Sequence, residues 1–186
     1  MAQAITFRSL SEGDLPRLTD WLNRPHLRRF YQPAAITREE VTAKYLSRIR
    51  GDVPTRSHLA LLAKEPFGYL QCYRNVDWPD WEAVIGPAGG VSIDLFIAEP
   101  SMLGRGLGRS MLRGYVDQVV FPMHPQEQWC WIGHDAENGA ARACSEAAGF
   151  TYVRDYVEDA VRCVLLRRPL LAPDHGGFDR FPRLGG

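Results

Sequence analysis

The sequence predicts one α+β (mixed α/β) domain, with a mostly antiparallel sheet of about seven strands flanked by about four helices. Three observations support this fold class. The chain has 186 residues, 45% apolar and 24% charged, which suits one soluble globular domain. Short apolar runs typical of strands alternate along it with stretches whose apolar residues recur at helical spacing. A turn with three glycines in five residues separates the fourth expected strand from a helix.

The first half of the chain is expected to form three strands and two helices. Apolar residues at helical spacing predict the first helix, and Pro25 is expected to end it. Thr37 and Glu40 form a capping box, whose side chains satisfy free amides at the start of the second helix. The expected elements are a strand over 5–10, a helix over 14–23, a helix from 37 through 49, and a hairpin with strands over 59–63 and 67–76.

The second half is expected to begin with a loop over 77–90 that is rich in Pro, Trp, Asp and Gly. Asn138 suits a helix cap, and Gly149 suits a left-handed helix terminator. The expected elements are a strand over 91–98, a helix over 107–121, a short strand over 129–132, a helix over 138–149, and strands over 150–157 and 161–167.

The boundaries of the domain follow from composition. The last 18 residues contain seven Pro or Gly. We therefore expect a folded domain over 1–168 and a disordered tail over 169–186.

Composition also disfavours several classes of function. The 22 basic residues balance the 22 acidic ones, so the basic excess of a nucleic-acid-binding protein is missing. No apolar run reaches the roughly 18 residues of a membrane span, and no signal segment opens the chain. The four cysteines lack the spacing of a metal or redox motif and lie among apolar neighbours, as reduced thiols do. We expect a cytoplasmic protein that binds no metal, no nucleic acid and no membrane.

The glycine-rich turn over 103–108 has a direct physical use. Its glycines let backbone amides converge at a helix N-terminus, which forms a cradle for phosphate, with Arg105 and Arg109 nearby. An ordinary tight turn is the alternative. A P-loop is excluded because Gly108 is followed by Arg109. A dinucleotide site is disfavoured because the turn follows the fourth strand of an antiparallel meander and not the first strand of a βαβ unit.

Several motifs together resemble the GNAT acetyltransferases, and within them the aminoglycoside 6'-N-acetyltransferases. The resemblance covers roughly 5–167 and implies transfer of acetyl from acetyl-CoA to an amine. The motifs are Trp21-Leu22-Asn23-Arg24-Pro25-His26, Pro66-Phe67-Gly68-Tyr69-Leu70-Gln71, Ser92-Ile93-Asp94-Leu95-Phe96-Ile97, Leu103-Gly104-Arg105-Gly106-Leu107-Gly108, Asn138-Gly139-Ala140-Ala141-Arg142 and Ala148-Gly149-Phe150.

Two residues depart from the pattern of that family. Leu103 replaces the Arg or Gln that usually opens the pyrophosphate motif. Ser145 replaces a Tyr that many of these enzymes place to protonate the leaving thiolate. Ser145 is therefore expected either to bond the coenzyme sulfur, directly or through water, or to be an ordinary helix residue.

Asp94 is the expected catalytic base. Strand alternation puts it on one face with Ser92 and Phe96, within a strand that is otherwise apolar. A carboxylate there costs free energy unless it is paired or functional. The alternative is an internal ion pair with an Arg, whereas the resemblance implies that Asp94 contacts the accepting amine.

The resemblance also implies where acetyl-CoA binds. The edge of the strand around Asp94 would pair with the pantetheine amides, and the amides of Leu95 and Phe96 would polarise the thioester carbonyl. Asn138 is expected to cap its helix, to contact pantetheine, or both. The expected cofactor-binding residues are Leu95, Phe96, Ile97, Leu103, Gly104, Arg105, Gly106, Leu107, Gly108, Arg109 and Asn138.

The segment 77–82 mixes three acids with two indoles, a composition that suits a polycationic amino sugar. A solvated loop whose Trp rings pack on the core is the alternative. An aromatic pair at Phe30 and Tyr31 is expected to form the opposite wall, and Asp135 to add a carboxylate. His134 is expected to satisfy a backbone group. The expected acceptor-binding residues are Phe30, Tyr31, Asp77, Asp80, Trp81, Asp94 and Asp135.

The sequence thus predicts an acetyl-CoA-dependent N-acetyltransferase that acts by direct transfer, with an aminoglycoside as its cationic small-molecule acceptor and antibiotic resistance as its role. One alternative is the same fold acting on a lysine-type siderophore precursor, a polyamine or a protein N-terminus. Another is a catalytically silent domain that binds CoA. The sequence leaves the oligomeric state open between a monomer and a homodimer.

Overall fold

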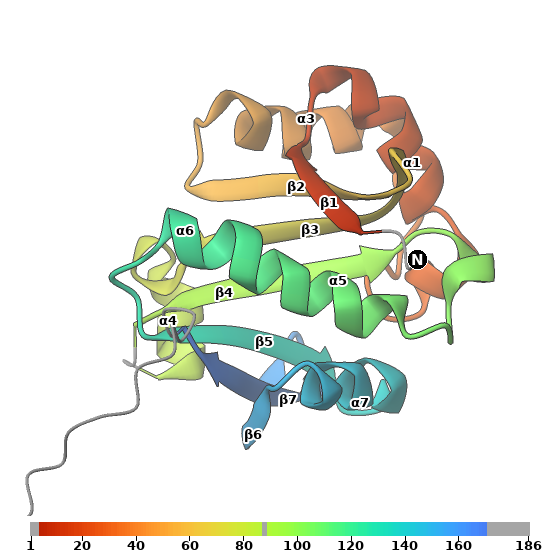
Figure 1. Cartoon of the computed structure of the whole chain (residues 1–186). Helices are drawn as coiled ribbons and strands as arrows, with labels where there is room; N and C mark the ends of the chain where they lie inside the picture. The colour runs from red at the N-terminus through yellow and green to blue at the C-terminus, as the bar shows by residue number, and fades with distance from the viewer. Residues whose placement is uncertain (1–3, 87–88, 171–186) are drawn as a thin grey trace, which may run out of the picture.

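The computed structural model describes residues 4–86 and 89–170. They form a sheet of seven strands in the order β1-β2-β3-β4-β5-β7-β6 (Figure 1). All neighbouring strands are antiparallel except β4 and β5, which are parallel. The strands are β1 Ile5–Ser9, β2 Thr55–Leu62, β3 Glu65–Arg74, β4 Val91–Ile97, β5 Trp129–Asp135, β6 Thr151–Glu158 and β7 Val161–Pro169.

The four predicted helices are present, with three further short α-helices among the described residues. The capping box at the start of α3 is confirmed, because Glu40 Oε2 accepts from the Thr37 amide and Thr37 Oγ1 accepts from the Glu40 amide. The predicted helices are α1 Leu15–Leu22, α3 Arg38–Arg50, α5 Leu107–Tyr115 and α7 Gly139–Ala147, and the short ones are α2 Pro25–Arg28, α4 Pro79–Ile85 and α6 Phe121–Met123.

The prediction of a loop over 77–90 was wrong for its centre, where α4 forms. Pro79 begins this helix, and the acidic Asp80 and Glu82 lie in its first turn, where they favour the helix dipole. Trp81 and Ile85 turn inward and pack with Trp131. The same residues that suggested a loop therefore include start signals of a helix.

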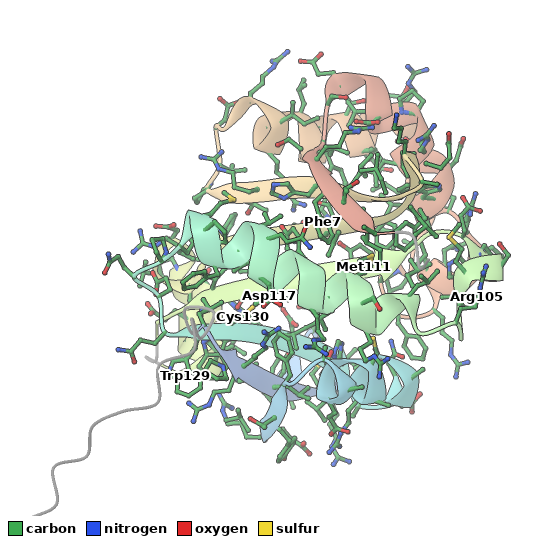
Figure 2. All side chains as sticks on the ribbon, viewed as in Figure 1. Phe7, Arg105, Met111, Asp117, Trp129 and Cys130 are labelled. Carbon is green, nitrogen blue, oxygen red and sulfur yellow. The ribbon has the colours of Figure 1, made fainter. Side chains whose placement is uncertain are left out.

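Helices cover both faces of the sheet. Met111, Leu112 and Tyr115 of α5 pack with apolar side chains of the central strands on one face, in front of which α5 and α7 lie in Figure 1. Gly68 admits Met111, since a Cβ at Gly68 would lie 2.9 Å from Met111 Sδ. Figure 2 shows Met111 and Phe7 between α5 and the strands. On the other face, α1 and α3 pack against Tyr69 and Phe96, and α4 packs against Trp131.

The parallel strands β4 and β5 separate soon after they meet. Their register contains only the pairs Val91 with Cys130 and Ser92 with Trp131, although each strand has seven residues. Beyond Ser92 the edge of β4 that faces β5 has no strand partner among the described residues. The sheet is thus split at its centre. We call the space between the diverging ends of β4 and β5 the strand gap.

The hydrogen bonds to β3 show which backbone groups of β4 face the strand gap. The Ala98 amide donates to Phe67 O, and the Asn75 amide donates to Gly90 O. Because hydrogen-bonded pairs alternate along an antiparallel ladder, the amides of Asp94 and Phe96 face β3. The amides of the intervening Leu95 and Ile97 therefore point toward β5 and the strand gap.

The folded part continues beyond the predicted domain end. Strand β7 reaches Pro169, and Leu170 is buried in the main core. The rest of the predicted tail, 171–186, lies outside the described residues. Within the described ranges, no helix is both long and apolar enough to cross a membrane. Over the same ranges, no group of three His, Cys, Asp or Glu side chains is placed to hold a metal ion.

Candidate active site

Two adjoining cavities lie beside the strand gap. The larger has a volume of about 400 Å³ and the smaller about 160 Å³, and they share Tyr73, Trp81 and Glu158. The larger is also lined by Arg48, Thr55, Gln71, Trp78, Pro79, Asp80 and Val84. The smaller is also lined by Ser92, Ile93, Asp94, Gly133 and Tyr156. Their lining residues come from α3, α4, the segment before α4, and strands β2 to β6.

Asp94 lines the smaller cavity, as its predicted role requires. Its Oδ2 accepts a hydrogen bond of 2.6 Å from Gln71 Nε2, the residue opposite it on β3. Burial raises the pKa of Asp94 above its ordinary value, while the Gln71 hydrogen bond and the charges of Arg48 and Lys44 oppose that rise. Among the described residues Asp94 forms no ion pair with an Arg, so the alternative explanation for its presence loses its basis.

Gln71 is held in one orientation by a buried network that the sequence did not predict. Its Oε1 accepts from Arg48 Nη1 at 2.5 Å and from Tyr69 Oη at 2.8 Å. The Tyr69 hydroxyl in turn lies 2.8 Å from Ser57 Oγ. With its oxygen occupied by two donors, the Gln71 amide must present its nitrogen to Asp94. The network therefore fixes both the position of the carboxylate and a donor that stabilises its charged form.

Helix α4 supplies one wall of the larger cavity, including the predicted Asp80 and Trp81. The Trp81 ring packs edge-on against Tyr156 at 5.7 Å, and its Nε1 donates to Ser92 Oγ at 2.7 Å. Trp81 is thus anchored to the sheet and also lines the cavity, so the two interpretations of this segment are compatible. Asp77 lies outside both cavities, in the turn before α4.

Glu158 contributes a carboxylate that sequence reasoning missed. It ends β6 and lines both cavities. Burial, followed by the negative charges of Asp94 and Asp159, raises the pKa of Glu158 above its ordinary value. The cavities therefore collect Asp80, Asp94 and Glu158 from three distant parts of the chain. A cationic ligand would relieve the repulsion between Glu158 and Asp94.

Besides Asp77, three predicted acceptor residues lie outside the two cavities. Tyr31 packs edge-on against Phe96, with ring centroids 4.7 Å apart, and lines neither cavity. Phe30 lies beneath the guanidinium of Arg29, at 4.8 Å. Asp135 ends β5, where it accepts the amide of Glu137 at 2.8 Å. The expected aromatic wall at Phe30 and Tyr31 is therefore not part of these cavities.

The glycine-rich turn precedes α5, as predicted, and its residues Leu103, Gly104, Arg105 and Gly106 are exposed (Figure 2 labels Arg105). Gly104 and Gly106 have φ angles of +72° and +75°, which L side chains adopt rarely. Gly108 serves another purpose, since a Cβ there would lie 2.9 Å from Cys144 Sγ of α7. The half-buried Leu107 packs against the main core, and Arg109 is exposed. The turn thus presents open backbone at a helix N-terminus.

The remaining cofactor predictions concern β4 and α7. Leu95 and Ile97 direct their amides to the strand gap, whereas the Phe96 amide faces β3 and the Phe96 ring packs with Tyr69. Of the two amides expected to polarise the thioester, only that of Leu95 is so placed. Asn138 caps α7 through a 3.1 Å hydrogen bond from the Ala141 amide to its Oδ1.

The buried Ser145 pairs with the half-buried His134. Ser145 Oγ lies 2.8 Å from His134 Nε2. The prediction that His134 satisfies a backbone group was wrong. The sequence signal was the alternation of β5, which turns His134 toward α7.

Comparisons with known proteins agree with this architecture. Residues 11–157 match the family model described as an acetyltransferase (GNAT) domain. Two curated relatives are named aminoglycoside N(6')-acetyltransferase type 1, one from Klebsiella pneumoniae and one from Serratia marcescens. Each is 32% identical over 151 residues, which cover 79% of this chain and 74% of the relative.

Solved structures give the same picture. A structure of AAC(6')-Ib in complex with paromomycin and acetyl-CoA aligns with a TM-score of 0.81 at 29% identity, covering 89% of this chain and 93% of that one. A structure of the aminoglycoside acetyltransferase AAC(6')-Ib with coenzyme A and kanamycin aligns with a TM-score of 0.80 at 29% identity, covering 89% and 95%.

Proposed function

The chain belongs to the GNAT acetyltransferase family and is an N-acetyltransferase, and from that premise we propose that it acetylates the 6'-amine of an aminoglycoside, with acetyl-CoA as donor. The observation that carries this proposal is the cavity pair, where Asp80, Asp94 and Glu158 meet the indoles of Trp78 and Trp81 beside the strand gap. The related proteins named above bear the same activity in their names or bind such ligands.

The donor fits the strand gap and the turn before α5. The amides of Leu95 and Ile97 both point into the strand gap, where that of Ile97 is oriented to bond a pantetheine amide and that of Leu95 to bond the thioester carbonyl. The exposed amides of the glycine turn, at a helix N-terminus, suit a pyrophosphate, and Arg105 and Arg109 add positive charge. The reaction needs no metal.

The chemistry is a direct attack. The amine nitrogen bonds to the thioester carbonyl carbon, the C–S bond breaks, and its electron pair leaves on sulfur. Asp94 takes the proton that the amine must lose, and the Leu95 amide stabilises the charge that develops on the carbonyl oxygen. No acetyl-enzyme is needed, because an amine is already a competent nucleophile.

We place this activity in the cytoplasm and infer that it confers antibiotic resistance. All four cysteines are unpaired, which suits a reducing compartment. Acetylation would remove the positive charge of the modified amine, and with it the ability of that amine to form charge-assisted hydrogen bonds.

The deciding experiment measures thiol release from acetyl-CoA with a panel of amines. Turnover with kanamycin and tobramycin, and little with spermidine or a lysine derivative, is the expected result. Preference for the lysine derivative would instead support a siderophore precursor as acceptor. CoA binding without turnover on any amine would show a silent binding domain.

Asp80→Asn is expected to raise KM for kanamycin about two- to fivefold, because an exposed charge pair contributes up to about 1 kcal/mol. KM for acetyl-CoA should stay the same, and added salt should weaken kanamycin binding to the wild type. Steady-state kinetics at two ionic strengths measures both effects. Asp77→Asn is the matched control, since it removes the same charge three residues away and outside the cavities. Equal effects of the two variants would contradict a role for Asp80.

A further inference from the structure

On the face of the sheet that α5 and α7 cover, a polar pair beside the strand gap has no role in the steps described so far. His134 lies on β5, three residues beyond the last pair with β4, and so in the part of β5 that borders the strand gap. Its Nε2 lies 2.8 Å from Ser145 Oγ of α7. No residue within 4–86 and 89–170 bonds the other ring nitrogen, Nδ1, which keeps solvent contact.

The hydroxyl of Ser145 decides which ring nitrogen carries the hydrogen. Ser145 is 1% exposed, and Nε2 is the one acceptor within its reach in the described structure. If Nε2 donated to Oγ, the serine hydrogen would be buried without an acceptor, at a cost of about 1–3 kcal/mol. The hydroxyl therefore donates to Nε2, and the hydrogen of a neutral ring lies on Nδ1.

The ring is neutral near pH 7. Burial lowers the pKa of His134 to about 4. A neutral imidazole with a fixed tautomer is a donor at one nitrogen and an acceptor at the other. His134, on the part of β5 that borders the strand gap, thus presents a single N–H that the described residues leave available.

We propose that the Nδ1–H of His134 donates a hydrogen bond to the sulfur of the departing thiolate, and that Ser145 is a positioning residue that fixes this tautomer. The inference rests on the proposed function, because it needs acetyl-CoA in the strand gap. No proton leaves the ring. The amine proton passes to Asp94, the sulfur keeps the electron pair of the broken C–S bond, and it takes a proton from water after release.

Two substitutions of His134 distinguish the effect of its hydrogen-bond donor from the effect of the space that its ring fills. An Asn amide nitrogen can replace Nδ1, whereas Leu fills the space without a donor. We expect His134→Leu to lower kcat about 10²-fold at unchanged KM for acetyl-CoA, and His134→Asn to retain activity to within about tenfold of the wild type. His124→Asn, in the connection between α6 and β5, is the control and should leave kcat unchanged. Equal losses in the Asn and Leu variants would overturn the proposal.

Nitrogen-15 NMR of histidine-labelled protein tests the positioning role without relying on turnover. The wild type should show His134 as the Nδ1–H tautomer, and Ser145→Ala should give a mixture, while Ser47→Ala on α3 should change nothing. CoA should shift the Nδ1–H proton signal more than desulfo-CoA, which lacks the sulfur. Equal shifts with both ligands, or an unchanged tautomer in Ser145→Ala, would overturn this inference alone. Failure of CoA to bind would instead overturn the proposed function.

Discussion

Replacing Asp94 by Asn is expected to lower kcat about 10²–10⁴-fold and to leave the affinity for acetyl-CoA unchanged. An aliphatic amine is mostly protonated near neutral pH, and only its neutral form attacks a thioester. Asp94 is the carboxylate held in place by Gln71 at the point where β4 leaves β5. Asn keeps the shape of the side chain and removes its charge and basicity. Steady-state kinetics with kanamycin and calorimetry with acetyl-CoA measure the two quantities.

The pH profile identifies the base independently. A carboxylate base works only when ionised, so activity falls as the pH drops through its pKa. Because burial raises the pKa of Asp94, this fall should occur at a higher pH than for an ordinary Asp. Asp94→Asn should lose that acid limb. Glu158, whose pKa burial also raises, is the rival, and Glu158→Gln should keep the limb. If Glu158→Gln lost the acid limb and Asp94→Asn kept it, Glu158 would be the base.

Replacing Gly106 by Val is expected to weaken acetyl-CoA binding about tenfold or more, measured by calorimetry. Gly106 has a φ of +75° and immediately precedes α5. A β-branched residue disfavours this conformation by about 1–3 kcal/mol, and its methyl groups would stand where the phosphates approach the backbone amides. The turn would therefore lose its backbone conformation, and the phosphates would no longer reach its amides.

Gly51→Val is the matched control for backbone strain. Gly51 has the same left-handed backbone as Gly106, with φ of +80° and ψ of +17°, and it lies at the end of α3, outside the glycine-rich turn. The two variants should lose similar stability in thermal unfolding, but only Gly106→Val should lose affinity for acetyl-CoA. If a folded Gly106→Val protein bound acetyl-CoA normally, the turn would not be the phosphate site.

Much of the fold could be predicted because its signals are local. Helical spacing, the capping box at Thr37 and the alternation of β4 depend on residues within a few positions of one another. Asp94 could be selected for the same reason, as a charge inside an apolar strand. Helix α4 was missed because its Pro and Asp residues indicate turns as readily as helix starts.

The supporting residues of the site could not be predicted from local pattern. Arg48, Gln71 and Glu158 come from α3, β3 and β6, and only the folded sheet brings them to Asp94. Taken singly in the sequence, each is an ordinary polar residue. The pair of His134 and Ser145 depends likewise on the packing of α7 against β5.

The split between β4 and β5 also bears on how the chain folds. Strands β1 to β4 come from 5–97 and strands β5 to β7 from 129–169, and every strand pair except β4–β5 lies within one of these two blocks. Contacts between nearby segments form before distant ones, so each block is suited to fold as a cooperative unit that α5 then joins to the other. Arg48 and Gln71 belong to the first block and Glu158 to the second. A small rigid-body rotation of one block against the other would open or close the larger cavity. No strand pair inside either block would have to break.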